Sequence, residues 1–198
     1  MAKSFRTIKE EIRILGIDDA PFKEKGVGKT LIVGTVFRAG EWLDGVLSRE
    51  IKVDGMDVTN KIVEMINSSR HNDQLRVIML DGITFGGMNS ADISEIHEET
   101  GLPVIVVNRK KPNFKRIKKA LEYFKDKEER WNCIESAGKV SKVKVNDHEL
   151  YIQIKGIEEK DAREILELSC TRSKIPEPLR AAHLIAAGVT DGESRGRA

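Results

Sequence analysis

Aspartate residues stand at three places where a folded chain could bring them together. Asp18 and Asp19 end an apolar segment, Asp54 and Asp57 precede a segment of helical periodicity, and Asp81 ends a second apolar segment. Carboxylates from separate elements can hold divalent cations that promote phosphodiester hydrolysis. We therefore expect a phosphodiesterase with Mg²⁺ or Mn²⁺ as cofactor. The candidate catalytic residues are Asp18, Asp54, Asp57 and Asp81, and the candidate metal ligands are Asp18, Asp54 and Asp81.

Only one member of the Asp18-Asp19 pair is expected to face the site. Successive side chains of a strand point to opposite faces of a sheet, so regular geometry admits one of the two. We choose Asp18 as the ligand and keep Asp19 as an accessory candidate. The pair could instead only end the strand before a turn at Pro21. Asp57 has a comparable alternative role as the N-cap of the helix that follows it, and spacing does not decide between Asp54 and Asp57.

Asp81 follows a run of four aliphatic residues, 77–80, and precedes Gly82. A buried strand of this kind would deliver the carboxylate at its carboxyl end, the usual edge of a ligand crevice in such sheets. Gly82, Gly86 and Gly87 make the following loop rich in glycine, so a substrate backbone could approach it closely. A flexible connection without substrate contacts would use the same residues.

The segment 109–119 holds seven basic residues in eleven positions. It directly follows the last apolar strand, near the point where the aspartates should converge. Basic groups there suit a polyanionic substrate, because they neutralise phosphates without reading sequence. We expect nucleic acid as the partner, with Arg109, Lys110 and Lys111 as substrate-binding candidates. The alternative is a solvated helix face, since a net charge of +2 does not by itself mark a nucleic-acid-binding protein.

The sequence disfavours several other chemistries. The segment EKGVGKT ends like a P-loop, but Lys23 stands where the first glycine should be, and a β-branched strand follows where a helix should begin. Cys133 and Cys170 are isolated and the histidines are scattered, which gives no zinc-binding pattern. No segment has the roughly 20 apolar residues of a transmembrane helix. We expect a reduced cytoplasmic protein without membrane contacts, and the oligomeric state is left open.

The order of apolar segments predicts which elements position these side chains. Alternation of apolar residues indicates strands, and helical spacing indicates helices. The expected strands cover residues 12–17, 31–37, 42–53, 77–80, 104–107, 140–145 and 150–154. The expected helices cover residues 58–66, 90–100, 158–169 and two segments that begin near residues 113 and 176. Short turns make the first three strands an antiparallel meander, and the later strand-helix-strand order makes a parallel crossover.

This α/β element order resembles that of the ribonuclease H-like fold, a mixed sheet of three antiparallel strands followed by parallel strands and flanked by helices. In that fold, acids from the first strand, the region of the first helix and the end of the fourth strand face one another. The inference is one of fold analogy. The 198 residues are expected to form a single domain, 1–198, with a hairpin insertion near 139–155 and a flexible tail at 190–198.

Two longer segments are similar to endonuclease V. Residues 81–113, DGITFGGMNSADISEIHEETGLPVIVVNRKKPN, resemble the stretch of that family from an Asp-Gly pair at a strand end to a basic residue after the next strand. Residues 173–188, SKIPEPLRAAHLIAAG, resemble its Pro-Glu-Pro-x-Arg-x-Ala helix. With ILGIDDAPF, VDGMDVT and GESRGRA, they make the chain similar to the archaeal endonuclease dU family, smaller relatives of endonuclease V.

The resemblance implies an enzyme of DNA repair that uses Mg²⁺ or Mn²⁺ to cut a strand near a deaminated base, of the deoxyuridine or inosine type. By motif, Asp18 matches the first metal-binding acid and Asp81 the third, while Arg109 or Lys110 matches a basic residue that faces the substrate. The middle acid of endonuclease V is a glutamate in a Phe-Arg-Glu motif. This chain offers Ser48-Arg49-Glu50 upstream and Asp54 or Asp57 downstream.

The chain also departs from the endonuclease V pattern. Gly87 stands where that family has a histidine six residues after the third acid, and the Tyr-Pro wedge that separates strands has no clear equivalent. His183 lies in the matching C-terminal helix and could approach the site, or it could be a surface histidine. These departures keep two other functions open. One is a non-cleaving nucleic-acid-binding protein on the same fold, and the other is a hydrolase of small phosphate esters or nucleotides.

Overall fold

The structure, a computed structural model, describes residues 5–24 and 26–194. Its centre is a mixed sheet of seven strands in the order β3-β2-β1-β4-β7-β9-β8. These strands are β1 (Arg13–Asp19), β2 (Lys29–Arg38), β3 (Trp42–Lys52), β4 (Val77–Asp81), β7 (Val104–Asn108), β8 (Ser141–Val145) and β9 (His148–Lys155). A small second sheet pairs β5 (Thr84–Phe85) with β6 (Asn89–Ser90). The helices are α1 (Val58–Asn67), α2 (Ile93–Thr100), α3 (Phe114–Leu121), α4 (Lys127–Ser136), α5 (Glu159–Ser169) and α6 (Glu177–Asp191).

The pairing of the strands has the predicted topology. β1, β2 and β3 form an antiparallel meander. β1, β4 and β7 are parallel neighbours, as the predicted crossover requires. The expected hairpin near 139–155 is present as β8 and β9, and β9 joins the sheet antiparallel to β7.

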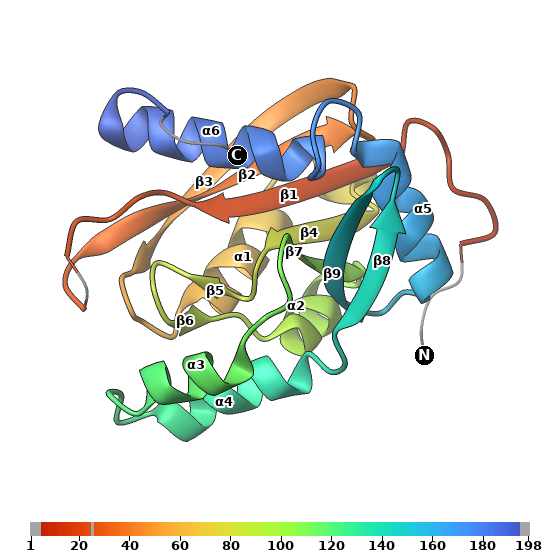
Figure 1. The fold of residues 1–198 in the computed structure, drawn as a ribbon. Helices are drawn as coiled ribbons and strands as arrows, with labels where there is room; N and C mark the ends of the chain where they lie inside the picture. The colour runs from red at the N-terminus through yellow and green to blue at the C-terminus, as the bar shows by residue number, and fades with distance from the viewer. Residues whose placement is uncertain (1–4, 25, 195–198) are drawn as a thin grey trace.

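Helices cover both faces of the sheet (Figure 1). Because successive side chains of a strand point to opposite faces, the central strands supply apolar side chains to both. Leu15 and Ile17 of β1 and Leu80 of β4 belong to the core beneath α1 and α2. Ile14 and Met79 belong to the core on the opposite face, beneath α5 and α6. Because β1 and β4 are buried on both faces, their ends are fixed with little freedom.

The structure corrects the start of the helix expected at residues 90–100. α2 begins at Ile93, and the Asp92 carboxylate caps it by accepting the backbone N–H groups of Ser94 and Glu95 at 2.8 and 3.2 Å. Asn89 and Ser90 form β6 instead. Asparagine, serine and aspartate all favour the N-cap position, so residue type alone did not distinguish among them.

α4 was not predicted. Its only buried side chains are Arg130 and Ile134, so it carries no apolar stripe at helical spacing. The helix expected to begin near residue 113 is α3, which ends at Leu121. α3 and α4 meet where the rings of Phe114 and Trp131 pack edge to face, with centroids 6.0 Å apart.

The C-terminal helix extends into the segment expected to be a flexible tail. α6 ends at Asp191, two residues into the range 190–198, and residues 195–198 lie outside the described residues. In the part of the chain that the structure describes, no helix combines the length and apolar character needed to span a membrane.

α6 lies directly on β1 because Gly16 has no side chain. A Cβ at Gly16 would be 2.5 Å from the carbonyl carbon and the Cβ of Pro178. The hydroxyl of Thr35 on β2 donates to the Pro178 carbonyl at 2.6 Å and fixes the start of the helix. α6 and β1 run in the same direction (Figure 1), so the next helical turn reaches the end of β1.

Gly16→Ala should lower the free energy of unfolding by about 1–3 kcal/mol, because the added methyl group meets backbone atoms of α6. Gly188→Ala in the same helix is the matched control, since a Cβ there meets nothing within 4 Å. Alanine favours a helix over glycine by roughly 0.5–1 kcal/mol, so the control should keep or gain stability. Urea unfolding followed by circular dichroism measures both. Unchanged stability of Gly16→Ala would contradict the close approach of helix and strand.

Candidate functional site

Two carboxylates lie side by side at the ends of β1 and β4. The last aligned pair in the parallel register is Ile17 with Leu80, so the next residues are Asp18 and Asp81. Neighbouring strands are about 4.8 Å apart, and both aspartates project to the α6 face, opposite to Ile17 and Leu80. Burial, and then the charge of Asp18, raise the pKa of Asp81 to about 6. The structure thus brings together the two acids predicted to be the first and third of the site.

A histidine and an arginine flank this pair. His183 on α6 has its Nδ1 atom 2.8 Å from Oδ2 of Asp18, and this hydrogen bond raises the pKa of His183. Arg109, the first residue after β7, has a guanidinium nitrogen 3.6 Å from Oδ2 of Asp81. The Asp18 side chain is 8% exposed and the Asp81 side chain 21%. Asp81 is therefore the carboxylate more open to a substrate, and Asp18 is the one held by the protein.

Asp19 serves the loop that follows Asp81. Its Oδ2 atom accepts the backbone N–H of Gly86 at 2.8 Å. Burial, and then the charge of Asp18, raise the pKa of Asp19 to about 7. Alternation along β1 directs this side chain toward the α1 face. Asp19 therefore anchors the loop that contains Gly86, and its carboxylate is repelled by the charge of Asp18.

Asp54 is not brought to the pair. Its carboxylate accepts the backbone N–H groups of Gly26 and Met88 at 2.8 and 2.7 Å. Gly87 lies against this carboxylate with a φ of +94°, and a Cβ there would collide with it. Among residues 5–24 and 26–194, no group of three or more His, Cys, Asp or Glu side chains is arranged to hold a metal ion. The Asp54 carboxylate therefore joins two loops through backbone N–H groups, and its role as a metal ligand stays a prediction.

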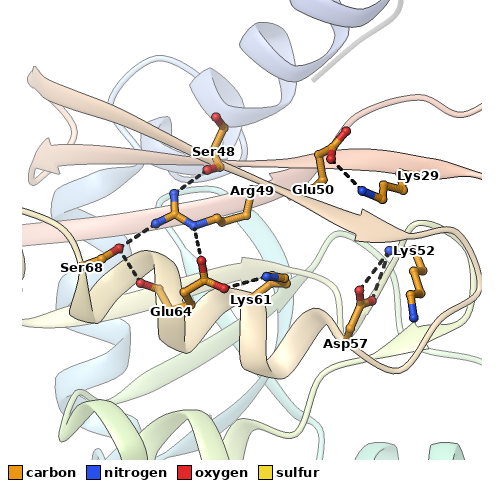
Figure 2. A network of polar contacts seen from close by, with 9 residues as sticks. All are labelled: Lys29, Ser48, Arg49, Glu50, Lys52, Asp57, Lys61, Glu64 and Ser68. Carbon is orange, nitrogen blue, oxygen red and sulfur yellow. Dashed lines mark hydrogen bonds and ion pairs between the residues drawn. The ribbon is translucent and has the colours of Figure 1, made fainter.

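Asp57 and Glu50, the other candidates for the middle acid, lie in a polar network along β3 and α1 (Figure 2). Asp57 accepts the backbone N–H of Lys52 at 3.2 and 3.3 Å and the side-chain amide of Asn89 at 2.7 Å. It stands at the N-cap position of α1 without capping the helix, because the Asn89 oxygen accepts the first helical N–H. Glu50 pairs with Lys29 at 3.0 Å on the surface. Asp57 therefore holds the start of α1 through the Lys52 backbone and Asn89, and its catalytic role stays a prediction.

Arg130 is a structural residue that the sequence analysis missed. Its guanidinium, in a side chain only 5% exposed, donates to the backbone carbonyls of Asp54, Gly55 and Met88 at 2.9, 2.8 and 2.7 Å. It also donates to both oxygens of Asp126, at 2.7 and 2.9 Å. Arg130 therefore ties α4 to the turn at residues 54–55 and to the loop that contains Met88. An arginine within a charged run gives no sequence signal of such burial.

The glycines of the loop have different surroundings. Gly82 follows Asp81 directly and donates its N–H to the Val107 carbonyl at 3.0 Å. Gly86 and Gly87 are held against Asp19 and Asp54, as described above. Of the three predicted substrate-binding glycines, Gly82 is the one that follows Asp81 directly in the chain.

The basic segment 109–119 is divided between two places. Arg109, Lys110 and Lys111 line a cavity of about 460 Å³ beside the β8–β9 hairpin. Arg109 also lines a neighbouring cavity of about 830 Å³ between that hairpin and the linker from α5 to α6. The remaining basic residues lie on α3, where Lys118 packs over the Trp131 ring at 4.2 Å. The start of the segment is therefore the part that adjoins Asp81.

The carboxylate pair suits a divalent cation. Mg²⁺ prefers oxygen ligands, and it is commonly held by one or two carboxylates together with substrate phosphates. Asp18 and Asp81 provide two such carboxylates, whose mutual repulsion a cation would relieve. The fit therefore does not require a third acid from the protein.

Comparisons with known proteins agree with this architecture. A family model described as Endonuclease dU matches residues 10–190. A UPF0215 protein of Methanothermobacter thermautotrophicus is 61% identical, over 98% of this chain and 96% of its own length. The crystal structure of a protein of unknown function from Archaeoglobus fulgidus has a TM-score of 0.82 at 35% identity, over 90% of this chain and 98% of that chain.

A more distant likeness concerns the fold. Endonuclease V of Ciona intestinalis, in complex with DNA that contains an inosine followed by a ribo-adenosine, has a TM-score of 0.58 at 11% identity. The match covers 88% of this chain and 84% of that chain. The predicted ribonuclease H-like fold is confirmed.

Asp81→Asn should stabilise the protein at pH 8 in the presence of a chelator. The folded-state pKa of about 6 lies above the ordinary value of 3.8, so the folded state loses stability as the pH rises through this window. The asparagine of the variant has no proton to lose, so it gains no buried negative charge as the pH rises. We expect it to be more stable by an amount on the order of 2 kcal/mol at pH 8, and to match the wild type at pH 4.

Urea unfolding at the two pH values measures this difference. Asp147→Asn is the control, because that side chain is 98% exposed and its substitution should leave stability unchanged at both pH values. A stability gap between Asp81→Asn and wild type that does not vary with pH would contradict the electrostatic account.

Proposed function

Because the chain belongs to the endonuclease dU family, we propose that it is a divalent-metal-dependent endonuclease that acts near deaminated bases in DNA repair. The substrate class would be nucleic acid with deoxyuridine or inosine, DNA in preference to RNA. The observation that carries the proposal is the aligned pair of Asp18 and Asp81, flanked by His183 and Arg109. The family description and the inosine-containing DNA bound by Ciona endonuclease V support the class of base.

Asp18 and Asp81 would hold Mg²⁺ or Mn²⁺, which when bound supplies positive charge to phosphoryl oxygens and lowers the pKa of water. His183 orients the Asp18 carboxylate through the 2.8 Å hydrogen bond. Arg109 stands on the exposed side of Asp81, so a phosphate that reaches Asp81 also meets a guanidinium. The chain's own contribution is thus to fix two carboxylates and to neutralise the approaching phosphate.

A non-cleaving nucleic-acid-binding protein is the second candidate. It is favoured by the lack of a three-ligand cluster among residues 5–24 and 26–194. Such a protein would keep the basic residues and the fold but would not hydrolyse a strand.

The proposed nuclease should cleave single- or double-stranded oligonucleotides that contain one deoxyuridine or one deoxyinosine when Mg²⁺ or Mn²⁺ is present. Asp81→Asn should lower the cleavage rate by roughly two orders of magnitude or more, because it removes one of two carboxylates at the proposed ion. Gel analysis of labelled strands measures the rates and the cut position.

Asp73→Asn is the matched control and should cleave like the wild type, because its carboxylate is exposed and lines neither cavity beside the carboxylate pair. Full cleavage by Asp81→Asn would reject the proposed site. Failure to cleave any strand of the panel, with binding intact, would favour the second candidate.

A further inference from the structure

A groove adjoins the carboxylate pair beside the β8–β9 hairpin. Its two cavities, of about 830 and 460 Å³, share Arg109, His148 and Lys174 in their linings. We name the two together the hairpin groove. Its walls are the turn of the β8–β9 hairpin, the linker 170–175 between α5 and α6, and the face of α6 that carries Arg180 and Leu184.

The groove is positively charged. Its larger cavity is lined by four basic side chains, Arg109, Arg172, Lys174 and Arg180, and by no acidic one. Arg180 is paired with the buried Glu177 at 2.7 Å. Arg172 and Lys174 are exposed and make no ion pair among the described residues. Two unpaired cations on one wall of a concave surface attract an anionic ligand.

The linker that carries these cations is held in place. The Asn146 amide on the hairpin turn donates to the Cys170 carbonyl at 3.2 Å. The Thr171 hydroxyl donates to the Gly40 carbonyl at 3.0 Å, and the Ser173 hydroxyl donates to the Ile175 carbonyl at 2.9 Å. The backbone on either side of Arg172 is therefore fixed before any ligand arrives, which reduces the entropy cost of binding.

Two contacts connect the groove to the carboxylates. Arg109 lines both of its cavities and lies 3.6 Å from Asp81. On α6, His183 contacts Asp18, and the next residue, Leu184, lines the groove. The groove is therefore continuous with the carboxylate pair through Arg109.

We propose that the hairpin groove binds the sugar-phosphate backbone of the nucleic-acid strand on one side of the bond that is cut, with Arg172 and Lys174 neutralising phosphates. The inference rests on the proposed function for the class of substrate. It adds a binding surface from the linker 170–175, which is distant in the sequence from the basic run at residues 109–119. Contacts of this kind position a strand without reading its sequence.

Binding of a labelled 20-nucleotide single strand, measured by fluorescence anisotropy in EDTA across a range of KCl concentrations, tests this proposal without cleavage. The double variant Arg172→Gln/Lys174→Gln should bind more weakly. The slope of log K against log [KCl] should become shallower by about 1.4, since each neutralised phosphate of a single strand contributes about 0.7.

Lys139→Gln/Lys160→Gln is the matched control. It removes the same charge from two exposed lysines that make no ion pair among the described residues and line neither cavity, and it should keep the wild-type slope. Equal losses in the two double variants would overturn the proposal in favour of a general charge effect. An equal loss of affinity for dUMP and for the 20-nucleotide strand would also overturn it, because the groove would then take a free nucleotide.

The outcomes separate this inference from the proposed function. A shallower slope in the groove variant, in a protein that cleaves no modified strand, would keep the groove and reject the nuclease. Cleavage near deaminated bases together with an unchanged slope would reject the groove alone.

Discussion

Two negative charges held next to each other at buried strand ends are the constraint on which the rest of the site depends. β1 and β4 are central strands with apolar cores on both faces, so Asp18 and Asp81 cannot move apart without disturbing the sheet. Their repulsion is offset by His183 from α6 and Arg109 from the end of β7. Gly16 is part of the same arrangement, because it lets α6 approach closely enough to deliver the histidine.

The other acids of the region build the loops around the site. Asp19 and Asp54 hold the glycine-rich loop through backbone N–H groups, and Arg130 ties α4 to the same loops. These internal contacts hold the loops around the carboxylate pair in place. Through Arg109 the pair also adjoins a groove lined with basic side chains. A site that binds a polyanionic strand needs carboxylates held by rigid supporting contacts.

The sequence predicted the sheet and two of the acids because buried strands are visible as apolar runs, and Asp18 and Asp81 stand at the ends of such runs. The middle acid could not be predicted in this way. Asp54 and Asp57 lie in a turn, and their partners include Met88 and Asn89 from a distant loop, so only the tertiary structure decides what they contact. Arg130 was missed because its burial depends on carbonyls supplied by distant loops.

The groove shows the same limit. Arg172 and Lys174 stand in a short linker without clustered charge in the sequence, and they meet Arg109 only because the linker lies against the hairpin turn. Local pattern identifies elements and their ends, whereas a surface assembled from three elements appears only once the chain is folded.

Calorimetric titration with Mn²⁺ tests most directly whether the carboxylate pair is a cation site. The account predicts uptake by the wild-type protein, affinity at least about tenfold lower in Asp18→Asn, and unchanged affinity in Glu50→Gln, whose carboxylate lies on the surface beside Lys29. No uptake by the wild type, or equal affinity in Asp18→Asn, would contradict it.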